Sequence, residues 1–520
     1  MSRMRTLFRD GRVHTPADPS ATAMLVDGDT IAWLGPTADA PSVAGGRVDR
    51  VVDLDGALVT PAFVDAHVHT TATGFTLRGL NLAGTRSRAA VLDAVAAHAA
   101  TLPADAIVIG HGWDESGWAD QRTPTAAELD RAGGGRGVYL SRACVHAALV
   151  SSGLLTGQVR AAAGYDASGW LRRDAHHLVR EVAFGSVTHA QVLDAQRAAL
   201  AHAASLGIAS VHECGGPGTS GEADFVAALS HGDGYPQVFG LWGEPNAAAK
   251  ARELGAVGAA GDLYADGALG ARTAHLRSAY LDGAAGAAGS EGGGEHGHGY
   301  LSAAQVTEHL VDCAKHGVQG GFHAIGDQAI ATVLDGFAGA AKRVGLERIR
   351  AGRHRIEHVE LLDKALIAGL VDHGIVASVQ PAFDRLWGGE HGMYAQRLGK
   401  ARSLASNPIG ALAGVGVLLA FGSDSPVTDL DPWGSCRAAM RHHNPVQRIG
   451  AKAAFAAHTR GGWRAVGVDD EGVLNPGWSA TFTVWDTTED ISEVLHTEDN
   501  PRARVTVLRG RPIHVRQEPR

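Results

Sequence analysis

Short apolar runs alternate with longer alanine-rich stretches through most of the chain. The apolar runs have the length of β-strands and lie at residues 60–65, 106–110, 137–141, 208–211, 262–265, 320–322, 355–357, 376–379 and 418–422. The stretches between them, such as 88–101, 188–206 and 327–344, have the length and composition of helices. Strands that alternate with helices are typical of a parallel sheet with helices packed outside it. Since a (β/α)8 barrel has eight strands, at least one of these nine runs must be an insertion or a misassignment.

The two ends of the chain have a different pattern, in which short apolar segments are separated by Gly and Asp. Their spacing is typical of β-hairpins, and they lie at residues 23–28, 31–35, 50–56, 480–485 and 504–510. We therefore expect residues 1–57 and 471–520 to form one small composite β-sandwich. Residues 58–470 would form the barrel with its inserted loops, among them the Gly-rich stretch 283–299.

The composition is that of a globular protein with a sizeable core, since 45% of the 520 residues are hydrophobic and 19% are charged. The 55 acidic residues exceed the 46 Lys and Arg residues and are spread along the chain, which argues against a nucleic-acid-binding surface. The four cysteines lie at least 70 residues apart, which indicates a reducing compartment. Neither a signal peptide nor an apolar run of membrane-spanning length is visible, so we expect a cytoplasmic protein, without a membrane partner, that acts on a small molecule.

The first apolar run of the central region leads into His67 and His69. In a β-strand, residues i and i+2 point to the same side, so both imidazoles can face one metal ion. A His-x-His pair is a weak signal by itself, because a histidine at the end of a strand is more often a hydrogen-bonded structural residue.

Three further polar residues, His323, His358 and Asp424, each follow a predicted strand. In a (β/α) barrel the carboxyl ends of the strands converge on one mouth, so side chains from distant parts of the chain would share one cavity. Imidazole and carboxylate groups suit zinc, Fe(II) or Mn(II). Each residue alone could be structural or cap a turn, but together with the His-x-His pair they predict a site for a divalent metal, with zinc as the first choice.

Seven short motifs in the chain are found together in a known family. They are Pro61-Ala-Phe-Val-Asp-Ala-His-Val-His, His111-Gly-Trp-Asp, Ala265-Asp-Gly-Ala-Leu-Gly-Ala-Arg-Thr, Phe322-His-Ala-Ile-Gly-Asp, Arg355-Ile-Glu-His, Ser378-Val-Gln-Pro and Gly422-Ser-Asp-Ser-Pro-Val. In order and spacing they resemble the motifs of the amidohydrolase superfamily, and more narrowly of the amidohydrolase-3 group, to which N-substituted formamide deformylases belong. The resemblance covers nearly the whole chain and implies a hydrolase with one or two divalent metals in a distorted (β/α)8 TIM-type barrel.

The resemblance also implies roles for the strand-end residues. By position, His67 and His69 would be metal ligands from the first strand. From later strands, His323 and His358 would both be ligands, or one would be a ligand and the other a proton-transfer group. Asp424 would be the carboxylate of the last strand. Held in this way, the metal would activate water for attack on an amide, formamide or cyclic amide. Asp424 would accept the proton of that water and deliver it to the leaving nitrogen, and His358 would polarise the carbonyl oxygen.

The number of metal ions depends on a position at which this chain departs from its relatives. Members with two metals bridge them by a carboxylated lysine, and where relatives have a lysine before the Asp-Gly-Ala-Leu-Gly motif this chain has Asp262. None of its six lysines ends a predicted strand, so we expect one ion. Asp262 would be structural, since an acid at the start of a strand rarely faces the barrel mouth. Glu213, which lies beyond the strand at 208–211, is a further candidate for the site, and whether it or Asp262 replaces the lysine stays open.

Candidates for substrate contact follow predicted strands or lie inside the motifs. They are Trp113, Asp114, His146, Asp266, Arg272 and Gln380. Trp113 could equally belong to the core, and Arg272 could pair with Asp266 to hold a loop.

Two other functions are compatible with these residues. The first is an aminoheterocycle deaminase of the same superfamily, but deaminases usually carry a His-x-x-Glu pair after a middle strand, whereas His212 and Glu213 are adjacent here. The second is a metal-free relative that uses the barrel for binding or assembly, which would be expected to have lost ligands. Relatives are often dimers, so a homodimer is one expectation.

Overall fold

The structure is a computed structural model that describes residues 4–43, 48–115, 118–119, 122–142, 147–217, 219–281 and 295–517. By its internal contacts the chain divides into two compact units, one made of Met1–His69 with Leu200–Arg520 and the other of Thr70–Ala199. Each unit is described separately below. In the described part of the chain, no helix combines the length and the apolar character that crossing a bilayer requires.

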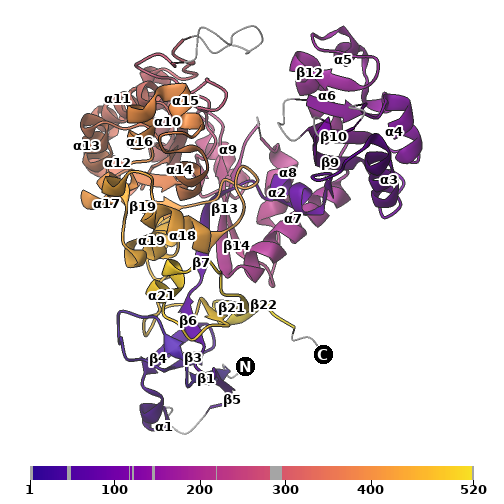
Figure 1. Cartoon of the computed structure of the whole chain (residues 1–520). Helices are drawn as coiled ribbons and strands as arrows, with labels where there is room; N and C mark the ends of the chain where they lie inside the picture. Colours follow the sequence, from indigo (N-terminus) through magenta and orange to yellow (C-terminus); the bar gives the residue numbers. More distant parts are fainter. Residues whose placement is uncertain are drawn as a thin grey trace. The chain divides into compact units, whose positions relative to one another are not determined.

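The larger unit contains an eight-stranded parallel sheet that curves into a barrel (Figure 1). Its strands, in spatial order, are β7 (Phe63–Val68), β13 (Ile208–Gly215), β14 (Gln237–Trp242), β15 (Gly258–Ala259), β16 (Gln319–Ala324), β17 (Arg355–His358), β18 (Val376–Val379) and β19 (Leu419–Phe421). A parallel bridge between Val68 and Ser425 closes the ring, and the Asp424 amide donates to the His67 carbonyl at 2.8 Å. The expected (β/α)8 TIM-type barrel is confirmed.

Helices follow most barrel strands and pack outside them. They include α8 (Glu222–Leu229), α9 (Ala248–Glu253), α10 (Ala303–His316), α11 (Asp327–Val344), α13 (Lys364–His373), α14 (Pro381–Trp387), α17 (Ile409–Gly414), α18 (Pro432–Met440), α19 (Ala451–Ala457) and α20 (Arg460–Ala465). The sequence sets both ends of α10: Ser302 and Gln305 form a capping box at its start, and Gly317 ends it with a left-handed φ of 65°.

Three of the nine predicted strands differ from the expected barrel strands. The runs at 106–110 and 137–141 are strands of the other unit, and the run at 262–265 follows the two-residue strand β15 instead of forming a regular strand. The prediction missed β14, because Gly and Pro residues on both sides of this short segment read as turns. The excess of candidates therefore came from an inserted sheet.

The unit Thr70–Ala199 lies in the sequence between the first and second barrel strands. It has a five-stranded sheet in the order β12 (Trp170–Arg172), β11 (Ala147–Val150), β10 (Val138–Arg142), β9 (Val108–Trp113) and β8 (Leu80–Asn81). Its helices are α2 (Thr70–Arg78), α3 (Arg88–Ala99), α4 (Ala126–Ala132), α5 (Gly157–Ala161), α6 (Arg173–Gly185) and most of α7 (His189–Ser205). The unit has its own hydrophobic clusters, one on each face of the sheet.

Both chain termini contribute strands to two small sheets in the larger unit. One sheet has the order β4 (Thr30–Gly35), β3 (Ala23–Asp27), β1 (Arg5–Arg9) and β5 (Arg50–Asp53). The other has the order β2 (Arg12–Val13), β6 (Leu58–Pro61), β20 (Phe482–Trp485), β21 (Ala503–Leu508) and β22 (Arg511–Val515). Apolar side chains of both sheets form one cluster that includes Met24, Ile31, Val59 and Phe482. The boundaries at 57 and 471 stay a prediction.

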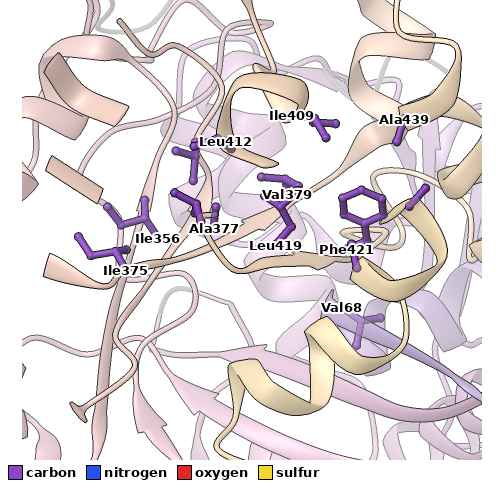
Figure 2. Close-up of a cluster of buried hydrophobic side chains, with 14 of the residues drawn as sticks. Val68, Ile356, Ile375, Ala377, Val379, Ile409, Leu412, Leu419, Phe421 and Ala439 are labelled. Atoms are coloured by element: carbon purple, nitrogen blue, oxygen red, sulfur yellow. The ribbon is translucent and has the colours of Figure 1, made fainter. Parts of the chain in front are cut away.

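The barrel core is a continuous cluster of branched and aromatic side chains. Figure 2 shows a part of it, in which Ala377 and Val379 of β18 and Leu419 of β19 lie near Ile409 and Leu412 of α17. Side chains on the outer face of parallel strands are covered by helices in this way, which is why the strands read as short uninterrupted apolar runs.

Phe63 joins three parts of the larger unit. Its ring lies 5.1 Å from that of Trp433 on α18, 5.1 Å from that of Phe455 on α19 and 5.8 Å from that of Trp485 on β20. The side chain is fully buried. Phe63 therefore packs the first barrel strand against two helices and the terminal sheet.

We predict that Phe63→Ala lowers the free energy of unfolding by about 3–5 kcal/mol, because truncation of a buried aromatic ring loses its transfer energy and leaves a cavity. Urea unfolding followed by circular dichroism measures this change. Val446→Ala serves as a control, since the Val446 side chain is 79% exposed. Equal stability of the two variants would contradict the assigned packing role of Phe63.

Candidate metal centre

Six acidic and imidazole side chains meet at the carboxyl ends of the barrel strands. They are His67 from β7, His69 directly after β7, Asp262 after β15, His323 from β16, His358 at the end of β17 and Asp424 after β19. Chemistry in (β/α)8 barrels is built at this face because every strand delivers its last residues there. The predicted convergence of residues from distant parts of the chain is therefore visible in the contacts between them.

The oxygens of two carboxylates lie close to the nitrogens of His67 and His69. Asp424 Oδ1 is 3.4 Å from His67 Nε2 and 3.3 Å from His69 Nε2. Asp262 Oδ1 is 3.5 Å from His67 Nε2, and its Oδ2 is 3.2 Å from His69 Nε2. On the other side of Asp262, its Oδ1 is 3.6 Å from Nδ1 of His323. These atoms thus surround one small region from several strands.

Three of these atoms are buried and have no hydrogen-bond partner among the described residues: His67 Nε2, His323 Nδ1 and Asp262 Oδ1. Buried polar atoms are normally paired, so a cluster of unpaired ones that face a common point suggests a ligand at that point. Ligands about 2.1 Å from a tetrahedral zinc ion lie about 3.4 Å from one another. The separations of 3.2 to 3.6 Å measured here agree with that value. The residues present therefore fit a divalent metal.

The electrostatics of the site favour positive charge at its centre. Burial disfavours the imidazolium of His69, yet hydrogen bonds to Asp262 and Asp424 raise its pKa well above the ordinary value. The same balance between burial and Asp262 raises the pKa of His323 to about 9. The neighbouring imidazoles in turn outweigh burial and hold the pKa of Asp262 well below its usual range. A site that stabilises imidazolium in this way also stabilises a metal cation.

Two of the histidines direct one ring nitrogen away from the cluster and towards an acceptor. His358 Nδ1 lies 2.8 Å from Gln380 Oε1, and His323 Nε2 lies 3.4 Å from the Gly267 carbonyl. When such a ring is neutral, as it must be to bind a metal, and its outer nitrogen carries the proton, the inner nitrogen has a free lone pair. Metal-binding histidines commonly have this arrangement, in which the second nitrogen donates to a carbonyl or carboxylate.

The environment of His358 keeps its ring neutral. Burial and the nearby His323 lower the pKa of His358 to about 4. Its ring stacks on that of Phe383, with 6.0 Å between centroids and 10° between planes. A neutral ring whose Nδ1 donates to Gln380 offers a lone pair at Nε2, which suits a ligand better than a donor to an oxyanion.

The backbone at two of these positions is in the left-handed region that non-glycine residues rarely adopt. The φ angle is 71° at His358 and 57° at Asp424. Such conformations cost free energy and cluster at functional sites, where the surrounding structure enforces them. At His358 the turn of the backbone breaks the strand alternation, so that Glu357 and His358 both approach the barrel interior although they are adjacent.

Asp262 differs from its expected position. It does not begin a strand, because β15 ends at Ala259 and Asp262 follows it. The structural role predicted for Asp262 assumed that it begins a strand, and this assumption is wrong. Asp262 and His67 belong with His358 to one group whose ligand atoms lie within 4.8 Å of one another, and His67, His69 and Asp424 form a second.

The structure gives Glu213 no place in these groups. It lies in β13 in register with Val68 and Gly240 and is buried. The neighbouring Cys214, rather than Glu213, forms a third group of ligand atoms with His67 and Glu357. Of the two residues considered as replacements for the lysine, the geometry therefore favours Asp262.

The predicted substrate contacts of the inserted unit have mixed outcomes. Trp113 is a core residue: it is fully buried, its Nε1 donates to the Leu140 carbonyl at 2.8 Å, and its ring packs on Trp170, so an accessible role is corrected to a structural one. Asp114 accepts a hydrogen bond from Arg142 at 2.6 Å, and its substrate role stays a prediction. His146 lies outside the described residues.

The other three predicted substrate contacts lie in the larger unit. Asp266 is fully buried and accepts hydrogen bonds from the backbone amides of His275, Ile325 and Gly326, so it joins two loops, and its role in substrate contact stays a prediction. Burial raises its pKa to about 6. Arg272 lies in the loop after Asp266, and its role stays a prediction.

The side-chain amide of Gln380 has two polar atoms with different surroundings. Its Oε1 accepts from His358, whereas its buried Nε2 has no hydrogen-bond partner among the described residues. The substrate role of Gln380 also stays a prediction.

In addition, the structure places Tyr264 at the site: its hydroxyl donates to Asp262 Oδ2 at 3.3 Å and its ring lies 4.8 Å from that of His323. The sequence pattern gave no signal for Tyr264, because the segment around it reads as a strand.

Comparisons with known proteins agree with this architecture. The profile of a family described as the amidohydrolase family matches residues 50–514. Amidohydrolase YtcJ of Bacillus subtilis is 26% identical over 523 residues, which cover 92% of this chain and 94% of that protein. An N-substituted formamide deformylase of Arthrobacter pascens is 28% identical over 160 residues, which cover 30% of this chain and 29% of that protein. The crystal structure of an uncharacterized metal-dependent hydrolase from Pyrococcus furiosus shares the fold, with a TM-score of 0.76 and 24% identity over 94% of this chain and 99% of that chain.

We predict that His67→Ala and Asp262→Asn both weaken binding of Zn²⁺ by at least about 100-fold, since even residues that only support a ligand contribute 10- to 100-fold. Competition with a chelating dye measures this affinity. His309→Ala is a matched control, because His309 is equally buried but its Nε2 faces the Ala259 carbonyl at 2.9 Å. If Asp262→Asn bound zinc as tightly as the His309 variant, Asp262 would not be a ligand.

Proposed function

Because the chain belongs to the amidohydrolase family, we propose that it is a metal-dependent hydrolase that cleaves a non-peptide C–N bond in an amide, formamide or cyclic amide. The observation that carries this proposal is the group of buried, unpaired ligand atoms at the barrel mouth. The partial similarity to an N-substituted formamide deformylase supports formamides as one substrate class to test first.

We further propose one metal ion, with zinc as its identity. The two groups of ligand atoms that contain Asp262 and Asp424 share His67, whose Nε2 faces both carboxylates, which supports a single position for the ion. Imidazole nitrogens and carboxylate oxygens are ligands that zinc accepts, although Fe(II) and Mn(II) accept them too. The ion would be held by His67, His69, Asp262 and Asp424. Two further candidate ligands, His323 and His358, lie beside Asp262. A divalent metal held here would supply Lewis acidity, which makes water a usable nucleophile near neutral pH.

In this reaction Asp424 serves as the general base and acid. Its Oδ1 lies between His67 and His69, and the φ of 57° together with the hydrogen bond to the His67 carbonyl fixes its direction. The carboxylate would take a proton from the attacking water and return it to the leaving nitrogen.

The substrate carbonyl would be oriented by Gln380 and not by His358. Since His358 Nδ1 donates to Gln380 Oε1, the inner nitrogen of the neutral ring has no proton to donate. The Gln380 Nε2 group does have protons and no partner among the described residues. An amide donor near the cluster suits a carbonyl oxygen whose negative charge grows during attack.

We predict that Asp424→Asn lowers kcat by about 10²- to 10⁴-fold, because Asn cannot relay a proton, while much of the bound zinc is retained. Steady-state kinetics on an N-formyl or N-acyl substrate, together with metal analysis, measures both effects. Asp327→Asn is the control, since Asp327 accepts the Arg277 amide at the start of α11. A kcat for Asp424→Asn equal to that of the control would remove Asp424 from the mechanism.

Removal of the metal should abolish turnover, and added Zn²⁺ should restore it, because the residues described at the barrel mouth supply no other electrophile of comparable strength. The assay uses a panel of N-formyl, N-acyl and cyclic amides with aminoheterocycles beside them. Ammonia release from the heterocycles alone would favour a deaminase. A folded protein that takes up no divalent metal would favour a binding or assembly role.

A further inference from the structure

A buried ion pair lies inside the barrel directly below the proposed metal site. Arg355 and Glu357 are two residues apart in β17, so their side chains point to the same side of the strand. Both are fully buried. Arg355 Nε donates to Glu357 Oε1 at 2.5 Å, and its Nη2 donates to Glu357 Oε2 at 3.0 Å. This two-point contact fixes the carboxylate plane as well as its position.

The remaining groups of the guanidinium are also engaged. Arg355 Nη2 donates to the Ala66 carbonyl and to Ser378 Oγ, each at 2.7 Å, and its Nη1 lies 3.1 Å from His212 Nδ1. A buried charge is tolerated only when its partners are in place, since desolvation of an ion costs several kcal/mol. Arg355 is therefore held by β7, β13 and β18 as well as by its own strand.

The neighbouring strand leaves space for this arginine. A Cβ atom at Gly321 would lie 2.8 Å from Arg355 Cγ. Any side chain at Gly321 would thus displace the stem of Arg355, and with it the carboxylate that Arg355 holds. The register of β16 and β17, in which Gly321 faces Arg355, is what makes the pair possible.

The Glu357 carboxylate contacts one residue of the proposed metal site, His67. Glu357 Oε2 lies 2.9 Å from His67 Nδ1, on the opposite side of the ring from the Nε2 atom that faces Asp262 and Asp424. Glu357 has no proton to donate while Arg355 is paired with it, so it accepts the proton of Nδ1. The lone pair of the neutral ring then lies on Nε2.

We propose that Glu357, clamped by Arg355, is a positioning residue that fixes the tautomer and the orientation of His67 for metal binding. The inference rests on the proposed metal site and concerns a residue that does not itself contact the metal. Hydrogen bonds from the outer nitrogen of a metal-binding histidine to a carboxylate raise the basicity of the ligand and hold its ring. This role explains why the barrel retains a costly buried ion pair beneath its mouth.

The test compares Zn²⁺ affinity of the full-length wild type, Glu357→Gln and Glu360→Gln by competition with a chelating dye. We expect Glu357→Gln to bind Zn²⁺ about 10- to 100-fold more weakly, because the amide is a poorer acceptor and loses the charge that orients His67. Glu360→Gln is the matched control: Glu360 is also buried after β17 but contacts Tyr394 and Asn407. The Zn²⁺ affinity and the kcat of Glu360→Gln should both stay within about twofold of the wild-type values. Affinity of Glu357→Gln within the same range would overturn the inference.

A second measurement applies if Glu357→Gln does not fold. A crystal structure of the wild type soaked with Zn²⁺ should show His67 bound through Nε2, with Nδ1 on Glu357. Coordination through Nδ1, or a Glu357 turned away from His67, would refute the positioning role while leaving the proposed function intact. Failure of the wild type to bind any divalent metal would remove both proposals together.

Discussion

Two buried carboxylates that approach the same two histidines need positive charge between them, and the arrangement of the barrel mouth depends on this requirement. Asp262 and Asp424 each lie within 3.5 Å of His67 Nε2 and closer still to His69 Nε2. In a region of low dielectric, two carboxylates that contact the same imidazole nitrogens repel each other unless a cation lies nearby. Imidazolium can supply that charge, and a divalent metal can supply more of it at a single point. A bound cation would account for the histidines, the acids and their unpaired atoms together.

The backbone delivers these side chains at some cost. His358 and Asp424 adopt left-handed φ angles, and Asp424 also takes part in the contacts that close the ring between β19 and β7. Because Asp424 both helps to close the barrel and belongs to the cluster of candidate ligands, the shape of the sheet and the geometry of this cluster depend on each other.

Much of the site could be predicted because its signals are local. His67, His323 and His358 each end a short apolar run, and parallel strands bring such ends together whatever the details of the barrel. Asp262 could not be predicted in the same way. Its barrel strand, β15, has only two residues, and the apolar residues after Asp262 imitate the strand that ends before it. The position of an acid relative to a strand of this length is decided by tertiary packing.

The inserted unit and the ion pair show two further limits of sequence patterns. The strands of residues 106–110 and 137–141 have the pattern of barrel strands, because a buried strand reads alike in any sheet, and Trp113 was associated with the site for this reason. Glu357 was overlooked although the signal was present: an Arg and a Glu two residues apart in an apolar strand must point to the same side. A pair of opposite charges buried in this way indicates a partner, and here the partner is a histidine.

The turn after β18 joins the candidate ligand His358 to an apolar surface. Gln380 precedes α14 and contacts His358, and Phe383 in the first turn of α14 stacks on the same ring. From there the aromatic contacts continue to Trp387, 4.8 Å from Phe383 between ring centroids. A substitution in this turn would therefore change the orientation of His358 together with the apolar surface beside it. Tyr264 borders the cluster from another side: its side chain is 38% exposed, its hydroxyl donates to Asp262 and its ring packs on His323, so a substitution there would alter the surroundings of both residues.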